Sequence, residues 1–67
     1  MKVKLNLETL KYKIGTLRES IIPIIFENED KVLDATPCPN FRDHYDVKVE
    51  FSRGPLRFHK NDLIFIE

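Results

Sequence analysis

The amino-acid sequence predicts a mainly β fold, either a single small barrel or a strongly bent antiparallel sheet of about five strands. Apolar and polar residues alternate with a period of two over residues 3–7, 47–51 and 56–59, as they do in half-buried strands. The chain has 67 residues, which is enough for one core but not for two. We therefore expect residues 1–67 to form a single β-rich domain.

The N-terminal segment contains two alternating stretches that are out of phase with each other. Residues 3–7 alternate in one phase and residues 10–14 in the opposite phase, so two strands here require a bulge or a short turn between them. A helix over residues 7–14 is the alternative, because the apolar residues of this stretch also fall near helical spacing. We expect the two strands.

The middle of the chain combines strand-forming residues with prolines. Residues 21–26 are rich in isoleucine, which favours a strand, but Pro23 cannot donate a hydrogen bond to a neighbouring strand and indicates a sheet edge. A further strand is expected over residues 31–36. Two prolines then favour an extended connection over residues 37–40, and the polar stretch 41–46 is expected to be an exposed loop.

The last third of the chain shows the clearest pattern, that of a β-hairpin. The alternating stretches 47–51 and 56–59 flank residues 52–55, which contain Gly54 and are expected to form a four-residue connection. An apolar run over residues 63–66 then predicts the final strand.

The second half of the chain also matches the order of strands and turns in a known superfold. A strand at Val32 is followed by a variable loop, the alternation of residues 47–51, a turn at Gly54 and an Asn-Asp-Leu tripeptide ahead of the final strand. In these features the segment 31–66 resembles the second half of an SH3-like small β-barrel, as in Tudor and KOW domains. The resemblance implies a 3₁₀ turn within residues 60–63, and it includes no catalytic residue.

Composition argues against several classes of protein. Eleven basic and eleven acidic side chains give a net charge of zero, which argues against strong general binding of nucleic acid. A single cysteine, Cys38, excludes an intrachain disulfide and fits a reducing compartment. The longest apolar run, residues 21–26, is interrupted by proline and is too short to span a membrane. We therefore expect a cytoplasmic protein that does not contact a membrane.

The residues that are candidates for metal binding or catalysis are few. They are Cys38, Asp43, His44, Asp46 and His59. Their spacing lacks the close pairs typical of structural zinc sites, so we expect neither a metal nor a cofactor. Cys38 and His44 have the chemistry of a nucleophile and its base, but a chain this small leaves little surface for a substrate cleft of about 300 Å³ or more. We expect no enzymatic activity and no small-molecule substrate.

The aromatic residues divide into an expected core set and an expected surface set. The core set is Phe26, Phe51, Phe58 and Phe65. Phe41 and Tyr45 lie in the polar loop beside Arg42, and aromatic and arginine side chains are favoured anchors of protein interfaces. Capping of the core by Phe41 is an equally weighted alternative. Including the edge segment, the predicted protein-binding residues are Ile22, Phe41, Arg42 and Tyr45.

The function predicted from these residues is binding without catalysis. We predict an adaptor module that docks on a protein partner or a larger assembly, or that forms a homo-oligomer through the edge segment. The alternative is a nucleic-acid-binding small barrel, in which loop aromatics stack on bases and a basic strip contacts phosphates. The residues of that strip are Lys11, Lys13, Lys48, Arg53 and Arg57. A solvated strand face with protective lysines explains the same residues without a ligand.

Overall fold

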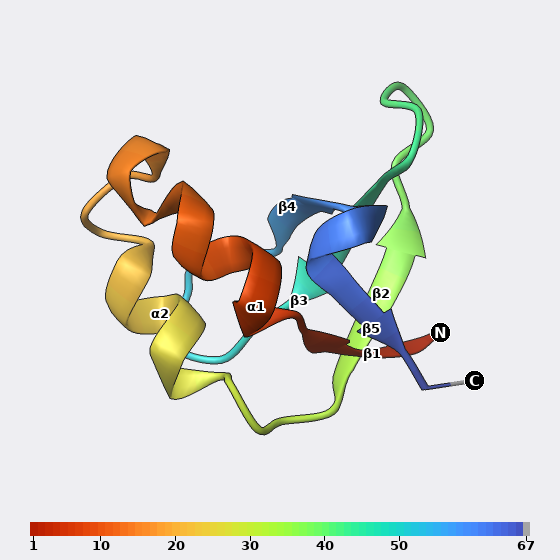
Figure 1. The fold of residues 1–67 in the computed structure, drawn as a ribbon. Helices are drawn as coiled ribbons and strands as arrows, with labels where there is room; N and C mark the ends of the chain where they lie inside the picture. The colour runs from red at the N-terminus through yellow and green to blue at the C-terminus, as the bar shows by residue number, and fades with distance from the viewer. Residues whose placement is uncertain (67) are drawn as a thin grey trace.

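The five strands form one antiparallel sheet in the computed structural model, which describes residues 1–66. The sheet order is β4-β3-β2-β1-β5, and a helical segment lies between β1 and β2 in the chain (Figure 1). The predicted mainly β class with about five antiparallel strands is confirmed. In chain order the elements are β1 (Lys2–Leu5), α1 (Leu7–Leu10), the 3₁₀ helix η1 (Lys11–Thr16), α2 (Ile22–Glu27), β2 (Leu33–Pro37), β3 (His44–Lys48), β4 (Leu56–His59), the 3₁₀ helix η2 (Lys60–Asp62) and β5 (Leu63–Phe65).

The sheet is strongly bent, and its inner face forms most of the core. Tyr45 in β3 and Phe65 in β5 bring their ring centroids to 5.2 Å, although β2 and β1 separate these strands in the sheet. This contact requires the twisted sheet to curl toward itself. The helix η2 joins the two edge strands, β4 and β5, and confirms the 3₁₀ turn expected before the last strand. The buried strand residues are Val3, Leu5, Leu33, Ala35, Val47, Phe58 and Leu63.

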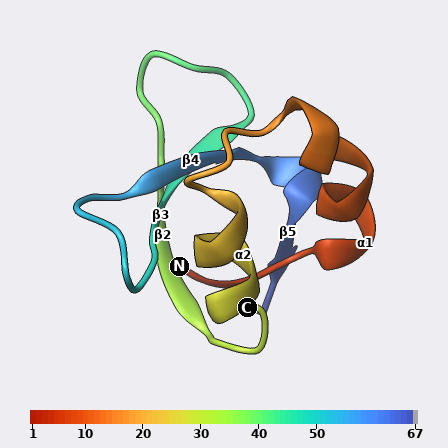
Figure 2. The ribbon, with the colours of Figure 1, turned by 90° about the vertical axis from the view of Figure 1, so that its left-hand side faces the viewer.

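The helical segment covers the concave side of the sheet. Figure 2 shows α2 in front of the curved sheet, with β2 and β3 on one side of it and β5 on the other. Leu10 of α1 and Ile25 of α2 are buried in the same core as the strand residues. The strands predicted over residues 10–14 and 21–26 are therefore wrong, and the helical alternative for residues 7–14 is confirmed.

Local chemistry explains both helices. The side chain of Asn6 accepts a hydrogen bond of 3.2 Å from a backbone N–H in the first turn of α1, and so caps that helix. Pro23 lies in the first turn of α2, where its missing N–H has no helical partner to lose. The surrounding isoleucines fall at helical i, i+3 and i+4 spacing, so Ile25 is buried while Ile21 and Ile24 are partly buried.

The hairpin of β3 and β4 is confirmed, but its register differs from the expectation. Val47 lies opposite Leu56, so the connection comprises residues 49–55 instead of residues 52–55. The strand β3 begins at His44, so residues 44–46 of the stretch 41–46, which the sequence predicts to be a loop, belong to a strand.

Several aromatic residues that the sequence predicts in the core are exposed in the structure. Phe58 is buried as predicted, whereas the predictions for Phe26, Phe51 and Phe65 are wrong, because these side chains are exposed. For Phe51 the cause lies in Asn28, which is fully buried at the end of α2. Asn28 Oδ1 accepts from Glu50 N–H (2.9 Å) and Asn28 Nδ2 donates to Glu50 O (3.0 Å). The chain is thereby fixed just before Phe51, which turns outward with a φ of 67°.

Candidate functional site

A groove with a volume of about 380 Å³ lies between β4 and the helical segment. One wall contains the four residues of β4 (Leu56–His59) together with His44, and Asp62 of η2 contributes to the same lining. The opposite wall is formed by Leu10, Lys13, Leu17 and Ile21.

The groove follows a free edge of the sheet. The strand order places β4 at an edge of the sheet. Successive side chains of a strand point to opposite faces, so a groove lined by all four residues of β4 meets both faces and runs along that edge. Across the β3–β4 pair, Lys60 N–H donates to Asp43 O at 2.8 Å. Hydrogen-bonded and non-hydrogen-bonded pairs alternate along an antiparallel ladder, so the neighbouring pair His44–His59 is not hydrogen-bonded. The same holds two positions further along, at Asp46–Arg57. The backbone groups of Arg57 and His59 therefore face away from β3.

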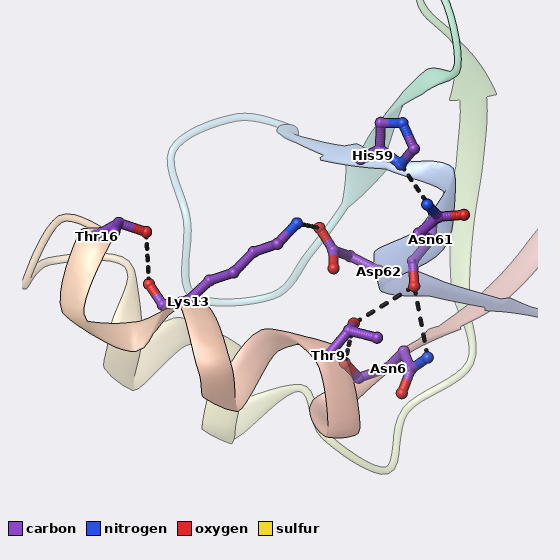
Figure 3. Close-up of polar contacts among 7 residues, drawn as sticks. All are labelled: Asn6, Thr9, Lys13, Thr16, His59, Asn61 and Asp62. Carbon is purple, nitrogen blue, oxygen red and sulfur yellow. Dashed lines mark hydrogen bonds and ion pairs between the residues drawn. The ribbon is translucent and has the colours of Figure 1, made fainter.

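A buried carboxylate lies in the groove wall. The Asp62 side chain is 5% exposed, and its Oδ2 accepts a hydrogen bond of 2.7 Å from Lys13 Nζ (Figure 3). Its Oδ1 is buried and has no hydrogen-bond partner within residues 1–66. In the same turn, Asn61 O accepts hydrogen bonds from Thr9 Oγ1 (3.4 Å) and Asn6 Nδ2 (3.5 Å). The two walls of the groove are therefore linked through η2 and α1.

Two half-buried histidines lie opposite each other on β3 and β4. The rings of His44 and His59 meet edge to face, with centroids 5.1 Å apart. His44 Nδ1 lies 2.7 Å from Arg42 O, and a carbonyl oxygen only accepts, so this nitrogen has the proton. His59 Nδ1 accepts from Asn61 N–H at 3.1 Å and is unprotonated. When the rings are neutral, these bonds leave His44 with an acceptor at Nε2 and His59 with a donor at Nε2, and both residues line the groove.

Two residues predicted for different roles are in contact beside the groove. The guanidinium carbon of Arg57 lies 3.9 Å from the ring centroid of Phe41, which is a cation–π contact. The Phe41 side chain remains 47% exposed, so it is available to a partner.

The other predicted protein-binding residues lie elsewhere. Tyr45 is half-buried and packs on Phe65. Ile22 on α2 lines a small apolar cavity of about 20 Å³ that faces α1 and η1. Arg42 contributes its backbone carbonyl to His44. The structure thus brings Phe41 and the backbone of Arg42 near the histidine pair, but it places Tyr45 and Ile22 on other parts of the fold.

Three of the five residues of the predicted basic strip lie beside acidic residues. Lys13 binds the buried carboxylate described above, Arg57 Nε lies 3.8 Å from Asp46 Oδ1, and Lys48 is opposite Asp34 in the sheet register. These acidic neighbours reduce the local positive charge that phosphate binding needs.

The remaining two basic residues are on other elements. Lys11 Nζ lies 5.3 Å from the ring centroid of Tyr12 in η1, and Arg53 is in the exposed connection between β3 and β4. The five residues are therefore distributed over the helical segment, the sheet and the connection.

The Lys2–Asp34 pair predicts how Asp34 titrates. Lys2 Nζ donates a hydrogen bond of 2.5 Å to Asp34 Oδ1, and this bond and the lysine charge lower the pKa of Asp34. Its small, solvent-screened contribution to stability is present at neutral pH and is lost as the pH falls through the folded-state pKa. We expect Lys2→Met to raise the Asp34 pKa toward its ordinary value in a carboxyl-carbon NMR titration. An unchanged pKa would show that Lys2 is not the cause.

The sequence patterns did not indicate Asp62 or the apolar wall of the groove as parts of a site. Asp62 belongs to the Asn-Asp-Leu tripeptide, whose pattern indicates a turn but not a buried carboxylate. The small size of the chain predicted little surface for a cleft, yet the groove exceeds the volume of about 300 Å³ from which ligand sites begin.

No group of three or more His, Cys, Asp or Glu side chains in residues 1–66 is placed to hold a metal ion. In the same part of the chain, every helix is too short or too polar to cross a membrane. Comparison of the chain with models of protein families, with curated proteins and with solved structures gave no match.

Proposed function

We propose that this chain is a small, non-catalytic binding module that receives an extended segment of a protein partner alongside β4. The observation that carries the proposal is the groove of about 380 Å³ along the free edge of that strand. An edge strand presents unpaired backbone groups, and addition of a partner's strand to such an edge is a recurrent mode of peptide recognition. Here Arg57 supplies its N–H and C=O and His59 supplies its N–H, because the carbonyl of His59 begins the helix η2.

The walls of the groove provide contacts for the side chains of such a segment. An extended segment directs alternate side chains to opposite sides. On one side they meet the apolar wall, where Leu17 and Ile21 are partly buried against the core. On the other side lie the histidine pair and the guanidinium of Arg57 on the ring of Phe41. Backbone hydrogen bonds would give affinity, and these side-chain contacts would give specificity.

Charge favours a protein over a nucleic acid as the partner. The chain has no net charge, and three residues of the predicted basic strip lie beside acidic groups. Nucleic-acid binding draws most of its affinity from neutralising phosphates, which this arrangement supports poorly. An exposed aromatic ring stacked by arginine, as in Phe41 and Arg57, is instead a common anchor of protein interfaces.

An SH3-like barrel is our proposal for the wider architecture. The bent sheet and the 3₁₀ helix η2 ahead of the last strand support it. The helical segment between β1 and β2 is an addition that the resemblance did not imply.

The test of strand addition uses His59, because two variants separate its backbone from its side chain. Its φ of −71° suits proline and its N–H faces away from β3, so His59→Pro removes one donor from the edge without straining the backbone. His59→Ala removes the same side chain but keeps the N–H, and it is the matched control.

Ligands for this test come from a phage-displayed library of random heptapeptides selected on the wild-type protein. We expect the selected peptides to bind His59→Pro about tenfold more weakly than His59→Ala in calorimetric titrations, because one hydrogen bond to the edge is lost. Equal affinities of the two variants would contradict strand addition. Failure to select any peptide would also overturn the proposal, and salt-sensitive binding of a single-stranded oligothymidylate would redirect it to nucleic acid.

A further inference from the structure

The carboxylate of Asp62 has an acceptor that the protein leaves empty. The residue is 4% exposed, Lys13 Nζ bonds to Oδ2, and Oδ1 has no donor within residues 1–66. Buried polar groups in folded proteins nearly always have a hydrogen-bond partner, and each exception needs an explanation. Figure 3 shows the carboxylate projecting from η2 toward the helical segment, which is the opposite wall of the groove. A donor delivered by a ligand in the groove would explain the empty acceptor.

Lys13 pairs with one oxygen of this carboxylate and leaves the other without a donor. Its side chain extends from η1 across to Asp62, makes one hydrogen bond to one oxygen, and is 47% exposed (Figure 3). The half-exposed ammonium can return to water if a cation of the ligand takes its place, because the buried carboxylate then stays paired. Movement of Lys13 toward solvent would therefore open Asp62 to a ligand.

We propose that the segment bound alongside β4 has an arginine whose guanidinium donates to Asp62. This inference rests on the proposed function and specifies the chemistry of the partner segment. A guanidinium presents N–H donors in a planar fork that fits the two oxygens of a carboxylate. It is also more weakly hydrated than an ammonium, which suits a carboxylate in a groove lined by Leu10 and Phe58.

The chain order places this contact at one end of the bound segment. Asp62 lies in η2, which directly follows β4, so the arginine would lie at the end of the segment beside His59. An acidic side chain at that position would meet the negative charge of Asp62 and be repelled. Charge complementarity therefore distinguishes a basic segment from an acidic one.

The test compares peptide selection on the wild-type protein and on Asp62→Asn, with the same random heptapeptide library. We expect the wild type to select arginine at a fixed position, and Asp62→Asn to lose that preference while it keeps the apolar positions. Replacing the selected arginine by citrulline, which has a similar shape and no charge, should weaken binding to the wild type at least about tenfold. The same replacement should leave binding to Asp62→Asn unchanged.

A variant of Lys13 and a measurement of folding complete this test. Lys13→Met removes the competing ammonium but keeps an apolar stem, and it should strengthen binding of the arginine peptide about threefold. Thermal denaturation of Asp62→Asn and Lys13→Met establishes that both variants are folded. Peptides that require the His59 N–H but have no basic preference would overturn this inference and leave the proposed function intact. Equal binding of the arginine and citrulline peptides to the wild type would also overturn it, and failure to select any peptide would overturn both proposals.

Discussion

Replacing Asn28 with alanine is expected to lower the free energy of unfolding by about 3 kcal/mol. The side chain is fully buried and makes three hydrogen bonds, with Ile24 O, Glu50 O and Glu50 N–H. Alanine leaves the backbone groups of Glu50 without their partner, and a buried unpaired group costs about 1–3 kcal/mol. A core of this size supplies only about 3–5 kcal/mol, so much of the variant should be unfolded.

Urea denaturation followed by far-ultraviolet circular dichroism measures this loss. Asn40→Ala, in the exposed loop between β2 and β3, is the control and should change stability by less than about 0.5 kcal/mol. A loss below about 1 kcal/mol for Asn28→Ala would show that this side chain does not fix the connection between β3 and β4 to α2.

The second large effect is expected at Leu10, where alanine should cost about 3 kcal/mol, while Tyr12→Ala should cost little. Leu10 is 2% exposed and Tyr12 is 83% exposed. Two residues that are two positions apart point to the same face of a strand but to nearly opposite sides of a helix. The pair of variants therefore distinguishes the helical segment from the strand that alternation predicted. Similar losses of stability for both variants in urea denaturation would favour the strand.

Ambiguity between two periods explains why the first helix was not predicted. The apolar residues of the stretch 7–14 satisfy both a period of two and approximate helical spacing, and alternation in residues 3–7 favoured continuing the strand. The cue that decides between them is Asn6, a residue type that favours helix N-caps and does cap α1. For α2 the cue is Pro23, which is unfavourable inside a sheet but suits the first turn of a helix.

The hairpin was predictable in kind but not in register. A connection of residues 52–55 would have paired Phe51 with Leu56, whereas the structure pairs Val47 with Leu56. The four-residue difference arises because Asn28 binds the backbone of Glu50 and ends the alternation there. Since that contact joins residues 22 positions apart, the alternating pattern within the hairpin contains no sign of it.

The candidate site was the least predictable part, because its residues meet only through the fold. Lys13 and Asp62 are 49 positions apart, and His44 faces His59 only in the observed register. Residue types alone suggested Phe41 as an anchor of a protein interface and Arg57 as part of a basic strip that contacts phosphates. Their contact with each other depends on where the loop before β3 lies against β4. Sequence patterns thus identified side chains suited to binding but not the edge along which they gather.

The pairing of the first strand with the last has a consequence for how this chain folds. Val3 lies opposite Phe65, so the β1–β5 ladder joins positions 62 residues apart. Contacts between distant positions require closure of a long loop before they contribute stability, and folds dominated by them form slowly. During synthesis, β1 leaves the ribosome before β5 and must wait for it before its second edge is covered. Until then, the nascent chain exposes an unpaired strand edge to other chains.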